Sequence, residues 1–264
     1  MMMHRRRDCL QWAALAAWGA VATPRAGWAQ TVAHVAAASN LKFALDEVAQ
    51  RFEQGSGHRL RITYGASGHF YAQIMQGAPF HLFMSADEWF VHQLHDAGKT
   101  FDLGRVYAHG RIGVIVPKGS RIRADAELRD VAAALRDGRL RRFAIANPAH
   151  APYGVLAREA LQKAGLWDAI QPRLVYGENV SQAAQFATSG ATDGGIIAYS
   201  LALAPAVAAL GEFALIAQDW HRPLAQRMVL MRQSPVAAQA FYDHLATPDA
   251  QAMLARHGFA VPAR

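Results

Sequence analysis

Residues 32–52 read VAHVAAASNLKFALDEVAQRF, and this stretch sets a pattern that the rest of the chain repeats. The run from Val32 to Ala38 is almost wholly apolar, which predicts a buried strand. Ser39 and Asn40 end that run, and both have side chains suited to capping a helix. Apolar side chains then recur at three- and four-residue intervals, with charged side chains between them, which predicts an amphipathic helix.

The same unit of strand, turn and helix recurs along the chain. Residues 59–64 alternate polar and apolar side chains as a second strand, and the turn at 65–68 leads into a helix at about 69–76. Further strands are predicted at 80–85, 111–116, 143–146, 174–176, 195–198 and 226–231, and further helices at 87–97, 153–164, 181–189, 236–245 and 249–257. Such alternation predicts an α/β fold with mostly parallel sheets, whose ligands gather where strands end and helices begin.

Pro117 closes one series of these units, and a second series follows it. We therefore expect two lobes, each a mostly parallel sheet flanked by helices, with two crossing strands as the hinge, near residues 112–118 and 218–228. Residues 30–114 and 225–264 are assigned to lobe 1, and residues 115–224 to lobe 2.

The first 29 residues have the composition of an export signal. Three arginines at 5–7 precede an apolar run from Leu10 to Ala22, which is shorter than the roughly 20 residues of a membrane span. We expect cleavage after Ala29. The arginines also fit a twin-arginine signal, and the sequence leaves that route and the general route open.

Charge and cysteine content exclude several classes of function. The formal net charge is +7, of which the expected signal carries +3, so 7 − 3 = +4 remains on the mature chain. The single cysteine, Cys9, leaves with the signal, which excludes a disulfide and a thiolate nucleophile from the mature chain. The densest basic group has no interleaved aromatic side chains to stack on bases, so we expect no nucleic-acid partner. Its members are Arg136, Arg139, Arg141 and Arg142.

Ser39 and Ser67 occupy equivalent places, because each follows a strand and opens a helix. Free backbone N–H groups and the positive end of the helix dipole meet at such a place, which suits an anion. In the alternative interpretation, each serine only caps its own helix. The second series adds a helix start at Tyr153, after Pro152, and another at Val180. Four such starts, drawn from two lobes, would form a cage of N–H and O–H donors.

Six segments, in the same order, resemble the periplasmic molybdate-binding proteins of ABC importers. These segments lie at residues 36–41, 64–68, 73–87, 147–154, 177–180 and 257–259. The most specific is the string GAPFHLFMSAD at 77–87, whereas the serine turns alone would be weak indicators. The resemblance implies the type II periplasmic-binding-protein fold, in which two hinged lobes close on a tetrahedral dianion without a cation as ligand.

The resemblance also implies a set of ligand donors, a location and partners. Its hydroxyl donors are Ser39 and Ser67, its side-chain amide donor is Asn40, and its backbone donors are Tyr153 and Val180. The implied protein is a periplasmic monomer without enzymatic activity or cofactor, which captures molybdate or tungstate for the membrane subunits of an ABC importer. Charge and size do not separate these two anions.

One position departs from the family pattern. Some members add a tyrosine hydroxyl from a strand that corresponds to residues 195–199, but here Ala198 takes the aligned position and Tyr199 follows it. A shift of one residue on a strand reverses the direction of the side chain. Tyr199 therefore has two interpretations, a ligand of the anion or an aromatic side chain packed beneath the cleft.

Other functions are open at this stage. The ligand could be another oxyanion such as sulfate, whereas a phosphate site usually needs an acceptor for the ligand's proton, and no carboxylate occurs among the implied positions. An exported serine hydrolase is a poor match, because His69 stands where the nucleophile elbow around Ser67 needs glycine. His92 and His95 have no third metal ligand at a clear spacing, so we expect no cation site there.

Overall fold

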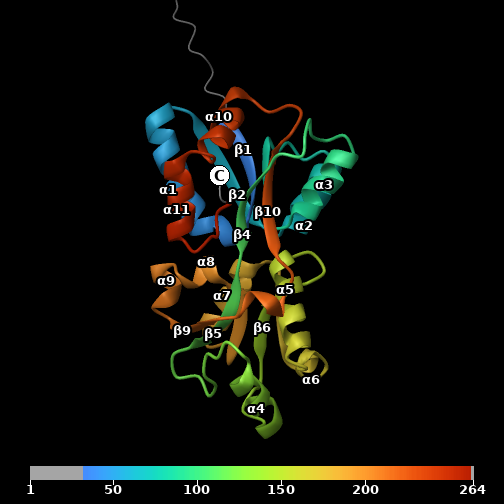
Figure 1. Cartoon of the computed structure of the whole chain (residues 1–264), viewed down its shortest axis with the longest axis vertical. Helices are drawn as coiled ribbons and strands as arrows, with labels where there is room; N and C mark the ends of the chain where they lie inside the picture. The colour runs from blue at the N-terminus through green and yellow to red at the C-terminus, as the bar shows by residue number, and fades with distance from the viewer. Residues whose placement is uncertain (1–31, 263–264) are drawn as a thin grey trace, which may run out of the picture.

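The computed structural model describes residues 32–262 and divides them between two five-stranded sheets (Figure 1). The first sheet contains, in spatial order, β2 (Arg59–Gly65), β1 (Val32–Ala38), β3 (Leu82–Ser85), β10 (Leu224–Leu230) and β4 (Arg105–Gly110). The second contains β7 (Leu174–Gly177), β6 (Phe143–Ala146), β8 (Gly194–Ala198), β5 (Ile112–Pro117) and β9 (Gly211–Leu215). In each sheet one strand, β10 or β5, runs antiparallel to both neighbours. The prediction of two α/β lobes is confirmed, but each sheet is mixed, with two parallel and two antiparallel pairings of strands.

Helices cover both faces of each sheet (Figure 1). In the first lobe they are α1 (Lys42–Ser56), α2 (Ser67–Met75), α3 (Glu88–Asp96), α10 (Val236–His244) and α11 (Pro248–Arg256). In the second they are α4 (Arg129–Asp137), α5 (Pro152–Lys163), α6 (Trp167–Ile170), α7 (Val180–Thr188), α8 (Tyr199–Ala202) and α9 (Pro205–Ala208). Three short 3-10 turns complete the list, η1 (Ser39–Leu41), η2 (Gln171–Arg173) and η3 (Gln218–Trp220).

The first repeat folds as its pattern predicts. The apolar positions of α1 are buried, namely Ala44, Leu45, Val48, Ala49 and Phe52. Gly57 ends the helix with a φ of 71°, in the left-handed region that glycine adopts without strain. Several elements escaped the sequence pattern, chiefly β4, β9 and α4. β9 has no fully buried residue, so it lacks the apolar run that marks a strand.

Two segments of chain cross between the lobes. At the first crossing only Arg111 separates β4 from β5, and at the second the chain passes from β9 through η3 to β10. Strand pairing places all of β5 in the second sheet and all of β10 in the first. The assignment of 30–114 and 225–264 to one lobe and 115–224 to the other stays a prediction.

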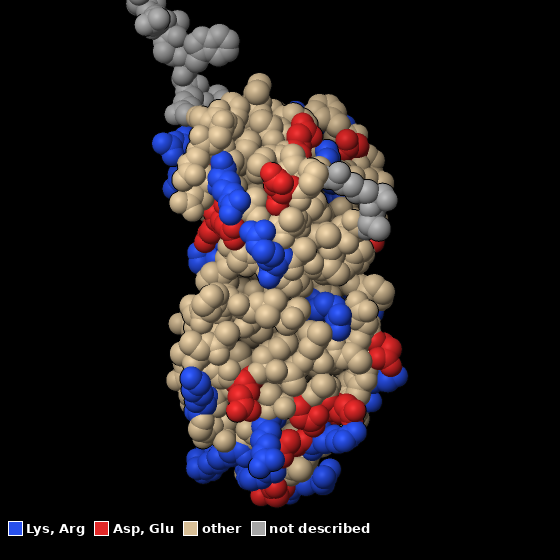
Figure 2. Space-filling model, turned by 60° about the vertical axis from the view of Figure 1, so that its left-hand side comes forward, with Lys and Arg blue, Asp and Glu red and all other residues tan. Residues whose placement is uncertain are grey.

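Carboxylates lie among the basic residues at the far end of the second lobe. The Arg139 guanidinium lies 2.8 Å from Asp137 and 3.3 Å from Asp130, and the backbone amides of Arg141 and Arg142 donate to Asp193. Figure 2 shows Lys and Arg intermixed with Asp and Glu on this end of the molecule, below the narrower waist between the lobes. The basic group seen in the sequence is thus offset locally by acidic groups.

The expected export signal at 1–29 lies outside the described residues. Within residues 32–262, no helix has both the length and the apolarity needed to cross a membrane.

The close packing of α5 on the second sheet yields a stability prediction. A Cβ at Gly154 would lie 2.2 Å from the carbonyl oxygen of Ala146, so the backbone would have to shift. We expect Gly154→Ala to lower the free energy of unfolding by about 1–3 kcal/mol, measured by chemical denaturation. Gly55→Ala is the control, because nothing lies within 4 Å of its Cβ and alanine favours the helix by up to about 1 kcal/mol. Equal stabilities of the two variants would contradict this account of the packing.

Candidate functional site

A small hollow lies between the lobes, and both lobes contribute to its wall. Its empty volume is about 190 Å³, which includes the solvent-filled space at its mouth. The lining residues are Ala38, Ser39, Asn40, Gly65, Ala66, Ser67, Ala86, Ala151, Pro152, Tyr153, Asn179 and Val180. All of them are uncharged. The structure therefore brings Ser39, Asn40, Ser67, Tyr153 and Val180 to one shared space, as the sequence predicted.

Four helical segments begin at the hollow. Ser39 is the first residue of η1, Ser67 is the first of α2, Val180 is the first of α7, and Tyr153 follows Pro152 in the first turn of α5. Backbone N–H groups in a first turn have no acceptor within their own helix. The positive ends of the helix dipoles of α2, α5 and α7 also point here. The backbone N–H groups of these four first turns can together donate hydrogen bonds to a small anion.

Each of the two serine hydroxyls accepts a hydrogen bond from a backbone amide. Ser67 Oγ accepts from the Ala86 amide at 2.9 Å, and Ser39 Oγ accepts from the Ser181 amide at 3.3 Å. Both serines are buried, and within residues 32–262 neither hydroxyl donates a hydrogen bond. Because a hydroxyl has one hydrogen to donate, each serine keeps that hydrogen for a further acceptor. No hydrogen bond joins Ser67 to His69, the two residues that the hydrolase alternative would pair.

A buried network of side-chain amides and hydroxyls stands behind the hollow. Asn40 Nδ2 donates to Tyr153 Oη and to Gln226 Oε1, both at 3.1 Å, and Gln226 Nε2 donates to Tyr153 Oη at 2.8 Å. Tyr107 Oη lies 2.9 Å from Gln226 Oε1 and 3.1 Å from the Ser85 carbonyl. Burial raises the pKa of both tyrosines above the usual value, so these hydroxyls stay neutral.

The orientation of Asn40 leaves one polar atom unsatisfied. Its Oδ1 is buried and has no hydrogen-bond partner among residues 32–262. The Tyr153 hydroxyl accepts two hydrogen bonds, and its own hydrogen has no acceptor within the same residues. A buried polar group without a partner costs about 1–3 kcal/mol, so this network is incomplete.

Direct hydrogen bonds join the lobes around the hollow. The Ser181 hydroxyl donates to the Ser39 carbonyl at 2.9 Å, and the Ser200 hydroxyl donates to the Asn40 carbonyl at 3.0 Å. The Gly68 amide donates to the His150 carbonyl at 3.0 Å. These contacts describe a closed arrangement. Sequence reasoning missed them, although Ser181 directly follows the predicted Val180.

Tyr199 does not line the hollow. Its ring stacks on Phe213 with centroids 5.6 Å apart, and its amide donates to the Arg111 carbonyl at 2.9 Å. Of the two interpretations, these contacts describe the packed aromatic. The neighbouring Ser200 is the residue of this segment that reaches across to the first lobe.

Comparisons with known proteins identify the relatives of this chain. The sequence profile described as "Bacterial extracellular solute-binding protein" matches residues 33–260. The molybdate-binding protein ModA of Rhodobacter capsulatus is 34% identical over 227 residues, which cover 85% of this chain and 86% of that protein. ModA of Azotobacter vinelandii is 32% identical over 229 residues, which cover 85% of this chain and 88% of that protein.

Solved structures give the same result. The periplasmic molybdate-binding protein of Azotobacter vinelandii superposes with a TM-score of 0.79 at 30% identity, covering 88% of this chain and 100% of that chain. The sulfate-binding protein SubI of Mycobacterium tuberculosis superposes with a TM-score of 0.69 at 20% identity, which shows a shared fold alone. The resemblance seen in the sequence is confirmed: this chain belongs to the bacterial extracellular solute-binding proteins and, among them, to the ModA family, whose members bind a solute and are not enzymes.

Proposed function

We propose that the chain binds molybdate or tungstate in the hollow and delivers the anion to the membrane subunits of an ABC importer. The observation that carries this proposal is the set of uncharged donors, drawn from four helical starts in two lobes, around one small space. The names of the relatives support molybdate as the ligand. A periplasmic monomer, exported through a signal at 1–29 by either the twin-arginine or the general route, is part of the same proposal.

The chemistry of the hollow favours a fully deprotonated anion. Among the described residues, no lysine, arginine, aspartate or glutamate lines it. A protonated phosphate would need an acceptor for its hydrogen, and a carboxylate would supply one. A dianion that carries four acceptor oxygens needs only donors, which N–H and O–H groups provide. Sulfate has the same charge but is smaller, so donors placed for a larger anion would be left unpaired around it.

The Asn40 amide completes this donor set if it turns over. A 180° turn exchanges the positions of the oxygen and nitrogen of a side-chain amide. With Asn40 and Gln226 both turned, the Tyr153 hydroxyl gains an amide oxygen as acceptor, and Gln226 donates to Tyr107 and to Asn40. Asn40 Nδ2 then occupies the position at which Oδ1 is now unpaired, and it can donate to the anion.

Calorimetric titration of the mature protein tests the choice of ligand. We expect molybdate and tungstate to bind with one site per chain, and sulfate and phosphate to bind much more weakly, because their size or protonation leaves donors unpaired. Heat from sulfate or phosphate, with none from molybdate or tungstate, would overturn the assignment.

The serine hydroxyls give a sharper test. A hydrogen bond to a charged group contributes about 1.5–3 kcal/mol, so Ser39→Ala or Ser67→Ala should raise the dissociation constant for molybdate roughly 10- to 150-fold. Ser189→Ala is the matched control, because Ser189 is exposed at the far end of α7. The N-caps of η1 and α2 are Ala38 and Ala66, so neither serine caps its own helix. If all three variants bind molybdate equally well, the two hydroxyls only join elements of the protein through Ala86 and Ser181 and are not ligands.

Closure of the lobes can be tested without touching the lining of the hollow. A Cβ at Gly68 would lie 2.7 Å from the His150 carbonyl oxygen of the other lobe. Gly68→Ala should therefore keep the lobes apart and weaken molybdate binding about tenfold, although alanine favours the helix locally. Calorimetry measures the affinity, and Gly55→Ala is again the control. An unchanged affinity in Gly68→Ala would show that binding does not need this closed contact.

A further inference from the structure

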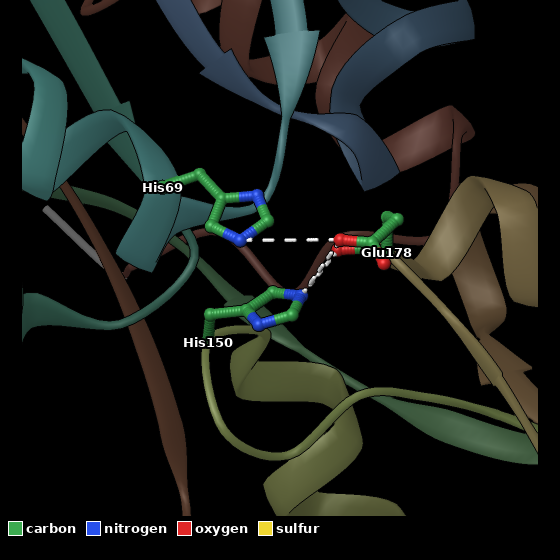
Figure 3. A group of neighbouring side chains, drawn as sticks. All are labelled: His69, His150 and Glu178. Carbon is green, nitrogen blue, oxygen red and sulfur yellow. Dashed lines mark hydrogen bonds and ion pairs between the residues drawn. The ribbon is translucent and has the colours of Figure 1, made fainter.

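Three side chains that can bind a metal meet at the edge of the contact between the lobes, outside the lining of the hollow. His69 lies in the first turn of α2, His150 precedes α5, and Glu178 precedes α7, so the first belongs to one lobe and the other two to the second. Figure 3 shows both imidazole rings beside the Glu178 carboxylate. One ligand atom from each residue lies within 4.8 Å of those of the other two.

The distances within this cluster are close to those of a metal site. His69 Nε2 lies 3.9 Å, and His150 Nε2 lies 3.5 Å, from the Glu178 carboxylate. Ligands of a tetrahedral zinc ion lie about 3.3 Å apart, given bonds of about 2.0–2.1 Å. The His69 ring is stacked on the His150 ring with centroids 3.9 Å apart, so it must turn out of that stack to coordinate the same ion. The side chains of His69 and Glu178 are 47% and 64% exposed, which leaves room for this movement.

The chemistry of the three groups also suits a metal. Two imidazoles and one carboxylate form a set that Zn²⁺ accepts, with a fourth position left for water. Metal binding needs neutral imidazole. His150 Nε2 now lies 2.9 Å from the Glu178 carbonyl, a hydrogen bond that coordination through Nε2 would replace.

We propose that His69, His150 and Glu178 form a Zn²⁺ site that is assembled by closure of the lobes and stabilises the closed form. His69 comes from the first lobe and its two partners from the second, so an open protein offers the ion at most two of the three ligands. A ligand that binds one of two states more tightly shifts the population toward that state.

Coupling to the anion follows from linkage and rests on the proposed function. If Zn²⁺ and molybdate both favour the closed form, each raises the affinity for the other by the same factor. Such factors are typically about 5- to 150-fold, and we expect roughly tenfold here. The backbone supports this coupling, because Gly68, next to His69, already donates to the His150 carbonyl across the two lobes.

Calorimetry on mature protein without a polyhistidine tag, stripped with a chelator, tests the proposal. Zn²⁺ is titrated into the protein alone and into the protein saturated with molybdate, and molybdate is titrated with and without Zn²⁺. We expect one Zn²⁺ per chain, bound roughly tenfold more tightly with molybdate present, and the same factor in the reverse experiment.

Variants locate the ion. His69→Ala removes a direct ligand, and since changes in outer-shell groups alone cost 10- to 100-fold, we expect a loss of Zn²⁺ affinity of about 100-fold or more and no remaining coupling. Glu178→Gln should act in the same direction. His92→Ala is the matched control, because His92 faces Glu88 at 3.9 Å on α3, within one lobe, and should retain both effects.

Equal Zn²⁺ binding by the wild-type protein and His69→Ala would overturn the proposed site, and so would Zn²⁺ binding that is indifferent to molybdate in a protein that binds both. The outcome is separable from that of the proposed function. Molybdate binding is measured first in the presence of the chelator. A protein that does not bind molybdate can still bind Zn²⁺ at this site when Zn²⁺ is titrated alone. The Zn²⁺ affinities of the wild-type protein and His69→Ala then test the metal site independently of the anion.

Discussion

The first turn of η1 and the first turn of α7 are hydrogen-bonded to each other, although they belong to lobes that share no strand. The Ser181 amide and hydroxyl bond to the hydroxyl and carbonyl of Ser39, and the rest of the fold makes this meeting possible. In each sheet the parallel strands end at the edge that faces the other lobe, so the helices that follow them start there. The hollow is a consequence of that arrangement, because each helix start brings N–H groups to the same gap.

Neutrality is what makes these donors suitable for transport. A lysine or arginine in the hollow would attract an anion whether or not the lobes were closed, and it would hold the anion against release. Oriented N–H and O–H groups act strongly only at short range in a water-excluded space, so their contribution depends on closure. The buried tyrosines fit this scheme, since burial raises the pKa of Tyr107 and Tyr153 and keeps negative charge away from the site.

Local sequence patterns predicted the parts of the molecule that depend on local physics. The strand at 143–146 and the helix after Asn40 follow from apolar runs and from periodicity, and so do the helix starts that carry Ser39 and Ser67. β9 escaped because an edge strand without buried residues has no such pattern.

The contacts that close the lobes could not be predicted in this way. Ser200 reaches Asn40 across 160 positions, and Gln226 joins Asn40 and Tyr153 from the opposite end of the chain. No spacing rule links such residues, because only the packing of two separately folded sheets brings them together. Tyr199 is a second example, because the sequence left its role open and did not indicate Ser200. Ser200 makes the hydrogen bond between the lobes, whereas Tyr199 packs on Phe213.

Two kinds of contact hold the closed form, and their balance decides how the protein can work. The proposed contacts in the hollow involve the anion, whereas Gly68 with His150 and Arg222 with Asp87 are contacts within the protein itself. Contacts of the second kind raise the population of the closed form, which favours affinity but hinders entry of the anion. Weak contacts of this kind, reinforced only when a ligand or an ion is present, keep both states accessible. The Zn²⁺ site proposed at Glu178 would meet that requirement, because the ion is supplied from solution.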